Sequence, residues 1–166
     1  SSITADVNGN RLDKIRKSQY VPMGIEVHLE EYSIQTGNTA TLHVNIGIVS
    51  NALGKSELQE AEDYASLEFT PNYFGSEYVR GKTHLTFSII LPAGMDSQEP
   101  RYHTPSNNWP GADEPAASFD SQDRVVYTWD AAEADVSSIY KFGASFPMRL
   151  VPAQVVVATE TPPVRS

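Results

Sequence analysis

The residues best suited to binding or chemistry in this chain lie in one segment, residues 92–123. The segment holds six acidic residues, five of the eleven prolines and a single arginine, Arg101. Connections of this length are uncommon in compact domains and often carry function, and prolines lower the entropy that ordering such a segment costs. The candidate binding residues are its histidine and its aromatic side chains, Tyr102, His103, Trp109 and Phe119. We therefore predict that the functional surface lies on residues 92–123.

Three interpretations of this segment compete. In the favoured one, Tyr102, Trp109 and Phe119 only hold the segment against a sheet. In the second, Trp109 and Tyr102 stay partly exposed as a platform for a protein partner or a sugar ring. In the third, carboxylates bind calcium, which takes about six to eight oxygen ligands. The candidate metal ligands are Asp113, Glu114, Asp120 and Asp123, but the spacing typical of calcium-binding loops is absent.

The other three histidines offer a second kind of metal chemistry. His28 and His43 share the polar face of a predicted sheet, and His84 joins them if its strand is adjacent. Three converging imidazoles would bind zinc or another transition metal and would make the protein a metal-dependent enzyme. Separate histidines that face solvent, with His43 paired to Glu30 or Glu31, are the favoured alternative.

Two enzyme motifs are present only in part. Residues 54–56 (Gly-Lys-Ser) match the end of a phosphate-binding loop, but Val49 stands where that loop needs its first glycine. Residues 138–141 (Ser-Ile-Tyr-Lys) match a Ser-x-x-Lys motif that begins a helix in penicillin-recognising enzymes, whereas their neighbours here alternate like a strand. A non-enzymatic domain is therefore favoured over an enzyme.

Alternation of apolar and polar residues predicts the elements that position these side chains. Residues 24–34 and 39–50 alternate around a turn, which predicts a β-hairpin. The alternation slips near Glu30 and Glu31, which predicts a β-bulge there. The register that matches the apolar faces then places Val27 opposite Ile46.

The rest of the chain also reads as short strands. A tight turn is predicted at 8–10 and a helix at 56–65, where a serine and a glutamine three residues later form a capping box. Further strands are predicted at 3–7, 65–69, 77–80, 83–91, 124–129, 138–150 and 155–157. This pattern predicts an all-β, mainly antiparallel fold, an immunoglobulin-like or jelly-roll-like β-sandwich with one short helix. Residues 1–158 are expected to form this single domain and residues 159–166 a flexible tail or tether.

Composition narrows the class of partner. The formal net charge is −9 and the isoelectric point about 4.8, which disfavours nucleic acid as a partner because phosphate binding needs clustered Lys and Arg. The chain has no cysteine, which excludes disulfides and Cys-ligated zinc and fits a cytosolic, an exported or a thermophilic protein equally. No apolar run is long enough to cross a membrane.

Four stretches carry a resemblance to known proteins. They are residues 91–94 (Leu-Pro-Ala-Gly), 99–103 (Glu-Pro-Arg-Tyr-His), 123–129 (Asp-Arg-Val-Val-Tyr-Thr-Trp) and 142–147 (Phe-Gly-Ala-Ser-Phe-Pro). Together they resemble uncharacterised extracytoplasmic β-sandwich domains of membrane-anchored proteins, over about the C-terminal two fifths of the chain. The resemblance implies an extracytoplasmic or cell-surface module tethered through residues 159–166, and it brings no catalytic or ligand-binding residues.

The sequence thus predicts a non-enzymatic interaction or display domain of a surface or membrane-attached protein. It would bind a protein or glycan partner through residues 92–123, without nucleic acid and without a cofactor other than the calcium considered above. One alternative is a carbohydrate-binding or carbohydrate-acting β protein that uses Trp109 and Tyr102 as a stacking platform. Another is a metal-dependent enzyme with the histidine cluster, and a cytosolic location stays open.

Overall fold

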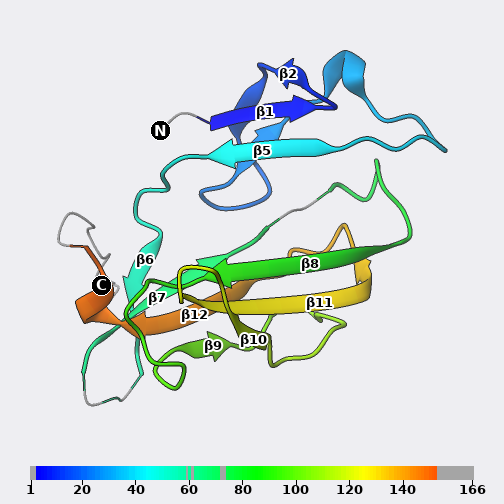
Figure 1. Cartoon of the computed structure of the whole chain (residues 1–166). Helices are drawn as coiled ribbons and strands as arrows, with labels where there is room; N and C mark the ends of the chain where they lie inside the picture. The colour runs from blue at the N-terminus through cyan, green and yellow to red at the C-terminus, as the bar shows by residue number, and fades with distance from the viewer. Residues whose placement is uncertain (1–2, 59, 61, 72–73, 153–166) are drawn as a thin grey trace, which may run out of the picture. The chain divides into compact units, whose positions relative to one another are not determined.

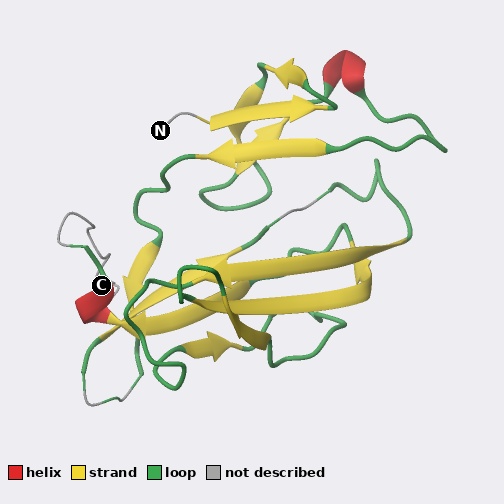
Figure 2. Cartoon of the chain, viewed as in Figure 1, coloured by secondary structure: helices red, strands yellow, loops and turns green. Residues whose placement is uncertain are grey.

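The computed structural model describes residues 3–58, 60, 62–71 and 74–152, and these fold almost entirely as β-strands (Figures 1 and 2). The helical elements in this part of the chain are two single 3-10 turns, η1 (Glu30–Tyr32) and η2 (Met148–Leu150). All paired strands are antiparallel, which confirms the predicted all-β class. The chain divides into two compact units, Ser1–Ser50 and Asn51–Ser166. The single domain over 1–158 stays a prediction, and the tail at 159–166 and the strand at 155–157 lie outside the described residues.

The first unit is built around a tight hairpin. Asn8 and Gly9 both have positive φ, 50° and 82°, as a two-residue hairpin turn of the primed type requires. This confirms the turn and the strand predicted at the start of the chain. The unit contains a sheet in the order β2-β1-β5 and a separate pair β3-β4. Its strands are β1 (Ile3–Val7), β2 (Asn10–Leu12), β3 (Ile15–Lys17), β4 (Ile25–Val27) and β5 (Leu42–Ile46).

The hairpin predicted between 24–34 and 39–50 is wrong. β4 pairs with β3, and β5 pairs with β1 instead. The slip in the alternation at Glu30 marks the start of η1, where Glu30 itself has a φ of 51°, and the chain turns rather than bulges. Alternation records which side chains share a face, but it does not identify the partner strand. In β5 it does not mark a buried face either, because Val44 is 41% exposed.

The second unit contains two sheets. One has the order β10-β11-β8 and the other the order β6-β7-β12-β9. The strands of these sheets are β6 (Leu53–Lys55), β7 (Tyr64–Phe69), β8 (Lys82–Ile90), β9 (Arg101–His103), β10 (Ala116–Phe119), β11 (Val125–Asp135) and β12 (Phe142–Pro147). Figure 1 shows β8 and β11 running side by side across the unit, as their long pairing requires.

The two sheets of this unit face one another across an aromatic core. Phe87 of β8 stacks on Phe69 of β7 with ring centroids 5.9 Å apart, and on Phe142 of β12 at 4.7 Å. Trp129 of β11 contacts Phe142 at 5.4 Å and is almost fully buried. Burial of rings of this size supplies most of the driving force for such a small core. The two-layer arrangement agrees with a β-sandwich, while the choice between immunoglobulin-like and jelly-roll-like stays a prediction.

The strongest strand predictions in this unit are confirmed. The strands predicted at 83–91 and 124–129 correspond to β8 and the first half of β11. The predicted inward side chains Leu85, Phe87 and Ile89 of β8, and Leu91 just after it, belong to the core, whereas Ile90 is exposed. The strand predicted at 138–150 is shorter and occupies Phe142–Pro147. The strand predicted at 77–80 is wrong, because the amide of Tyr78 bonds the Gly75 carbonyl in a turn.

The helix predicted at 56–65 is also wrong. Lys55 pairs with Ala65 in the ladder between β6 and β7, and the Ser56 amide donates to the Tyr64 carbonyl at 2.8 Å. Residues 59 and 61 lie outside the described part. The Ser56 hydroxyl does accept from a backbone amide, that of Leu58, but the bond closes a turn rather than a helix. Burial of Tyr64 and Ala65 in the sheet outweighs the weak local helix signal.

Candidate functional site

The predicted functional segment supplies an edge strand to each sheet of the second unit. β9 lies at one end of the four-stranded sheet and β10 at one end of the three-stranded sheet. Both lie on the same side of the unit, because Tyr102 of β9 contacts Tyr127 of β11, the strand to which β10 is paired. Residues 92–123 are therefore the border of a two-layer structure and not a single long loop (Figure 1).

Two of the four candidate binding residues are exposed at this border. Tyr102 is 39% and Phe119 54% exposed. Tyr102 lies opposite Ala144 and Phe119 opposite Val125, both of which are buried in the core. Residues directly opposite in a ladder share a face, so both rings belong to the inner faces of their sheets. They are exposed because each strand is the last of its sheet.

Trp109 is buried, which corrects the stacking hypothesis. The indole is only 8% exposed and packs edge-on against Tyr140 and Phe142, with centroids 5.2 and 5.0 Å apart. Its Nε1 donates to the Ala112 carbonyl at 3.1 Å. A ring covered on this scale has no open face for a sugar, so the favoured interpretation, an anchor for the segment, fits Trp109. Tyr102 and Phe119 are exposed, so the anchor interpretation does not account for them.

The four acidic candidates do not converge. Both carboxylate oxygens of Asp120 are used locally: Oδ2 accepts from Arg124 Nε at 2.7 Å, and Oδ1 accepts from the Gln122 and Arg124 amides. The Arg124 side chain is the main reason that the pKa of Asp120 is lowered. Within the described residues no group of three or more His, Asp or Glu side chains is placed to hold a metal ion. The predicted calcium set of Asp113, Glu114, Asp120 and Asp123 is therefore not assembled in this structure.

The three other histidines each have a separate carboxylate neighbour. His84 Nε2 lies 2.7 Å from Asp130 Oδ1, and the same oxygen accepts from Thr86. In the first unit, His43 Nδ1 lies 3.2 Å from Asp6, not near Glu30 or Glu31 as predicted. His28 Nε2 lies 3.6 Å from Glu26 Oε2. Each imidazole thus has its own carboxylate neighbour, and the converging three-histidine metal site is not formed among the described residues.

The fourth histidine belongs to a polar cluster that the sequence did not indicate. His103 Nε2 lies 2.9 Å from the Ser145 hydroxyl, which in turn lies 3.1 Å from the Ser56 hydroxyl. On the other side of the ring, His103 Nδ1 lies 3.8 Å from Glu68 Oε1, and Lys141 pairs with Glu68 at 2.8 Å. The cluster thus joins β7, β9, β12 and the end of β6.

Gly143 makes room for this imidazole. A Cβ built on Gly143 would lie 2.6 Å from the Leu67 carbonyl oxygen and even closer to His103 Nδ1, so no larger residue fits there without displacement. Gly143 stands directly opposite His103 in the ladder between β12 and β9. Burial lowers the pKa of His103, more than the nearby Glu68 carboxylate raises it, and Lys141 adds to the lowering. Burial therefore favours the neutral form of the ring.

The order serine, histidine, carboxylate is that of a nucleophilic triad. Ser145 is 0% exposed, which leaves its hydroxyl out of reach of a substrate. Ser145 also lies inside a strand that pairs with β7 on one side and β9 on the other, so the ladders occupy the backbone amides that an oxyanion hole would use. The cluster therefore lacks the access and the donors of an acyl-transfer site and acts as a partly buried polar link between strands.

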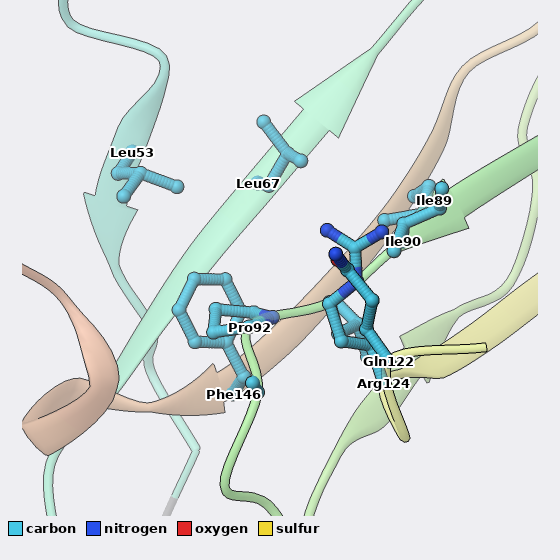
Figure 3. A pocket seen from close by; sticks show the side chains of 10 residues that line it. Leu53, Leu67, Ile89, Ile90, Pro92, Gln122, Arg124 and Phe146 are labelled. Carbon is cyan, nitrogen blue, oxygen red and sulfur yellow. The ribbon is translucent and has the colours of Figure 1, made fainter. Parts of the chain in front are cut away.

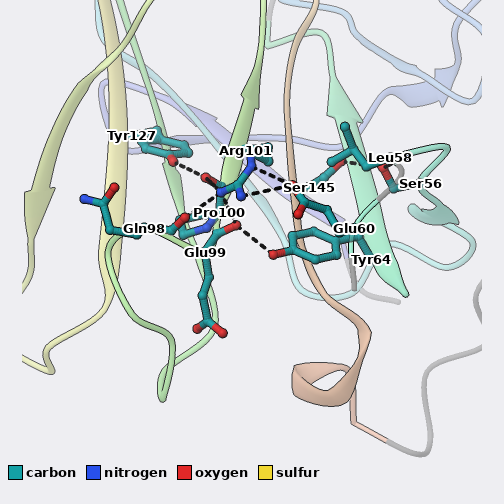
Figure 4. Close-up of polar contacts among 10 residues, drawn as sticks. All are labelled: Ser56, Leu58, Glu60, Tyr64, Gln98, Glu99, Pro100, Arg101, Tyr127 and Ser145. Atoms are coloured by element: carbon teal, nitrogen blue, oxygen red, sulfur yellow. Dashed lines mark hydrogen bonds and ion pairs between the residues drawn. The ribbon is translucent and has the colours of Figure 1, made fainter. Parts of the chain in front are cut away.

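A second network fixes the chain just before β9 (Figure 4). The Tyr64 hydroxyl donates to the Glu99 carbonyl and the Tyr127 hydroxyl to the Pro100 carbonyl, each at 3.0 Å. Arg101 Nη1 donates to the Gln98 carbonyl at 2.5 Å. Burial raises the pKa of both tyrosines, which keeps them protonated as donors. The exposed edge at β9 is thus held in place by hydrogen bonds from two buried tyrosines and from Arg101.

An apolar groove opens on the opposite side of the second unit, where β8 and β6 are the last strands of their sheets. Its volume is about 510 Å³. Figure 3 shows Leu53 and Leu67 on one wall, Ile89 and Ile90 on the other, and Arg124 at the rim. Among the described strands, the sheet that contains β6 has four members and the sheet that contains β8 has three.

Comparison with family models, with curated proteins and with solved structures found no match for this chain. No helix among the described residues is both long and apolar enough to cross a membrane.

Sequence analysis had singled out His103 but missed its partners Ser145, Glu68 and Gly143. Ser145 is the polar residue of an otherwise apolar strand, 142–147, and that contrast is the signal from which it could have been found.

Proposed function

We propose that this protein is a non-enzymatic interaction or display domain that binds a partner protein through the border formed by β9 and β10. The observation that carries the proposal is the exposure of Tyr102 and Phe119 on the inner faces of two neighbouring edge strands. Apolar side chains scattered singly over a surface are ordinary, but rings exposed at an open sheet edge combine an apolar contact with free backbone groups. Such an edge suits a partner that adds a strand and inserts apolar side chains.

The rigidity of this border supports the proposal. The chain entering β9 is fixed by the Tyr64 and Tyr127 hydroxyls, and the turn after β10 is fixed by Asp120 and Arg124. A preorganised edge loses little conformational entropy when it binds, so more of the contact energy appears as affinity. The attachment of the domain to a cell surface or membrane is part of the proposal and rests on the resemblance of the C-terminal part described above.

Affinity capture with matched surface variants tests this proposal. The immobilised protein is compared with the variant Tyr102→Ser/Phe119→Ser and with the control Phe74→Ser/Tyr78→Ser, which removes two exposed rings of the same unit elsewhere. We expect a partner retained by the unmodified protein and the control to be lost from the first variant, with at least about a tenfold fall in affinity, typical of two truncated anchors. Equal retention by all three proteins would refute the β9–β10 border as the binding surface.

The same three proteins also test the alternative, glycan binding. A glycan array probed with the three proteins would favour the carbohydrate alternative if signal disappeared with Tyr102→Ser/Phe119→Ser only. Because Trp109 is buried, Tyr102 is the single ring of the predicted platform that is open to a sugar. Nothing in the site geometry favours this alternative over a protein partner.

A further inference from the structure

We propose that the free edge of β5 is a self-association surface, through which two copies of this chain pair their β5 strands antiparallel about a two-fold axis at Val44. The pairing joins two sheets of the order β2-β1-β5 into one continuous sheet. This surface lies in the first unit and the partner surface proposed above lies in the second, so each is tested without the other.

The outer edge of β5 offers hydrogen bonds that no described strand takes up. β5 is the last strand of its sheet, beside β1 (Figure 1). The Asn8 amide donates to the Thr41 carbonyl at 2.9 Å, and these two residues continue the register of β1 and β5 as a hydrogen-bonded pair. Such pairs alternate along an antiparallel ladder. The amides and carbonyls of Leu42, Val44 and Ile46 therefore point away from β1, toward the free edge.

The apolar side chains of this edge complement themselves. Val44 lies opposite Ala5 in the ladder, so it shares the face of the buried core of the first unit, yet it is 41% exposed. A two-fold axis at Val44 places this residue opposite Val44 of the second copy and Leu42 opposite Ile46. Leu42 and Ile46 belong to the same face and are only partly buried. Pairing in this register therefore removes apolar surface of both copies from water on one face.

No like charges meet along the paired edges. The sequence of β5, Leu-His-Val-Asn-Ile, contains none of the Lys, Glu or Pro residues that commonly block sheet edges. The other edge of the same sheet, β2, carries a charge at Arg11. His43 of β5 has its carboxylate neighbour in Asp6, and the two-fold axis sets it opposite Asn45 of the second copy. The edge of β5 thus lacks the features that keep a strand from pairing with its own kind.

The distribution of charge favours the first unit as the place where two copies meet. Residues 1–50 contain four Lys or Arg and five Asp or Glu, a formal net charge of −1, whereas the whole chain carries −9. Two copies therefore repel less through the first unit than through the second. The first unit also gains more from added contacts, because its buried core among the described residues consists of Ala5, Val7 and Leu12.

Analytical ultracentrifugation of the full chain and of Val44 variants tests the proposal. We expect dimers of the unmodified chain and of the control Val44→Thr, which keeps a β-branched side chain without charge. Val44→Lys and Val44→Glu each set like charges opposite one another at the axis, and each should raise the dissociation constant of the dimer at least about tenfold. Mixing Val44→Lys with Val44→Glu should restore dimers, because opposite charges then face each other. A variant that fails to fold would give no such rescue.

The proposal is overturned by an unmodified chain that stays monomeric up to about 1 mM, by a dimer that persists in both charged variants, or by a mixture that fails to pair. A second measurement needs no substitution. In a mixture of isotope-labelled and unlabelled chains, we expect an interchain nuclear Overhauser effect between the Hα atoms of His43 and Asn45, because non-hydrogen-bonded pairs bring their Cα atoms to about 4.5 Å. A dimer without this signal also overturns the pairing.

Discussion

Replacing Gly143 by alanine tests whether the polar cluster around His103 requires glycine, the residue without a side chain, at position 143. The new methyl would lie 2.6 Å from the Leu67 carbonyl oxygen and closer still to His103 Nδ1, distances that real Cβ atoms essentially never show. Overpacking costs about 1–3 kcal/mol. Displacing the imidazole also gives up its hydrogen bond to Ser145, at about 0.5–1.5 kcal/mol. We therefore expect Gly143→Ala to lower the free energy of unfolding by about 2–4 kcal/mol.

Urea unfolding followed by tryptophan fluorescence measures this loss. Both tryptophans of the chain, Trp109 and Trp129, lie in the second unit, so the signal reports the unit that contains Gly143. The control is the same substitution in a His103→Ala background, where the contact with the Leu67 carbonyl remains and the contact with the ring is gone. Gly143→Ala should then cost about 1 kcal/mol less, a coupling expected of residues in direct contact. A loss below about 1 kcal/mol, or equal losses in both backgrounds, would refute the role given to Gly143.

Three further outcomes follow from the same geometry. Burial lowers the pKa of His103 below its usual 6.5, so His103 binds a proton more tightly in the unfolded chain than in the folded one. The contribution of His103 to stability should therefore be complete above pH 6.5 and fall as the pH drops below it. His103→Gln should flatten the fall of the urea midpoint between about pH 6.5 and 5. Asp120→Asn removes the ion pair with Arg124 and should lower the urea midpoint, whereas an unchanged midpoint would contradict the turn contacts described. Tyr127→Phe removes the bond to the Pro100 carbonyl and should cost about 0.5–1.5 kcal/mol in the same titration, and a stabilised variant would show that this bond does not hold β9.

The sequence predicted the strands of the second unit best where burial alternates strictly. In β8, Leu85 and Ile89 face the core and His84 and Thr86 face solvent, so a period of two identifies both the strand and its inner face. β9 and β10 were missed because each is a short edge strand with exposed residues, bounded by prolines or turns inside residues 92–123. Exposed edge strands carry no apolar period to detect.

Which strands pair with one another was harder to predict from the sequence than where the strands lie. β4 and β5 are adjacent in sequence, yet each pairs with an earlier strand, β3 or β1. Long-range pairing depends on which apolar faces meet in the folded unit, and a single sequence records only the faces. The candidate site was likewise predicted only in part. The exposed rings Tyr102 and Phe119 were identified from residue type, whereas the contact between His103 and Ser145 joins positions 42 residues apart and needed the sheet.

The arrangement of β9 and β10 has a mechanical consequence. A single stretch of chain borders both layers of the second unit, so a partner attached to it transmits any pulling force to two sheets at once. Detaching the stretch requires the ladder to β12 and the ladder to β11 to be broken, together with the buried tyrosine bonds near Pro100.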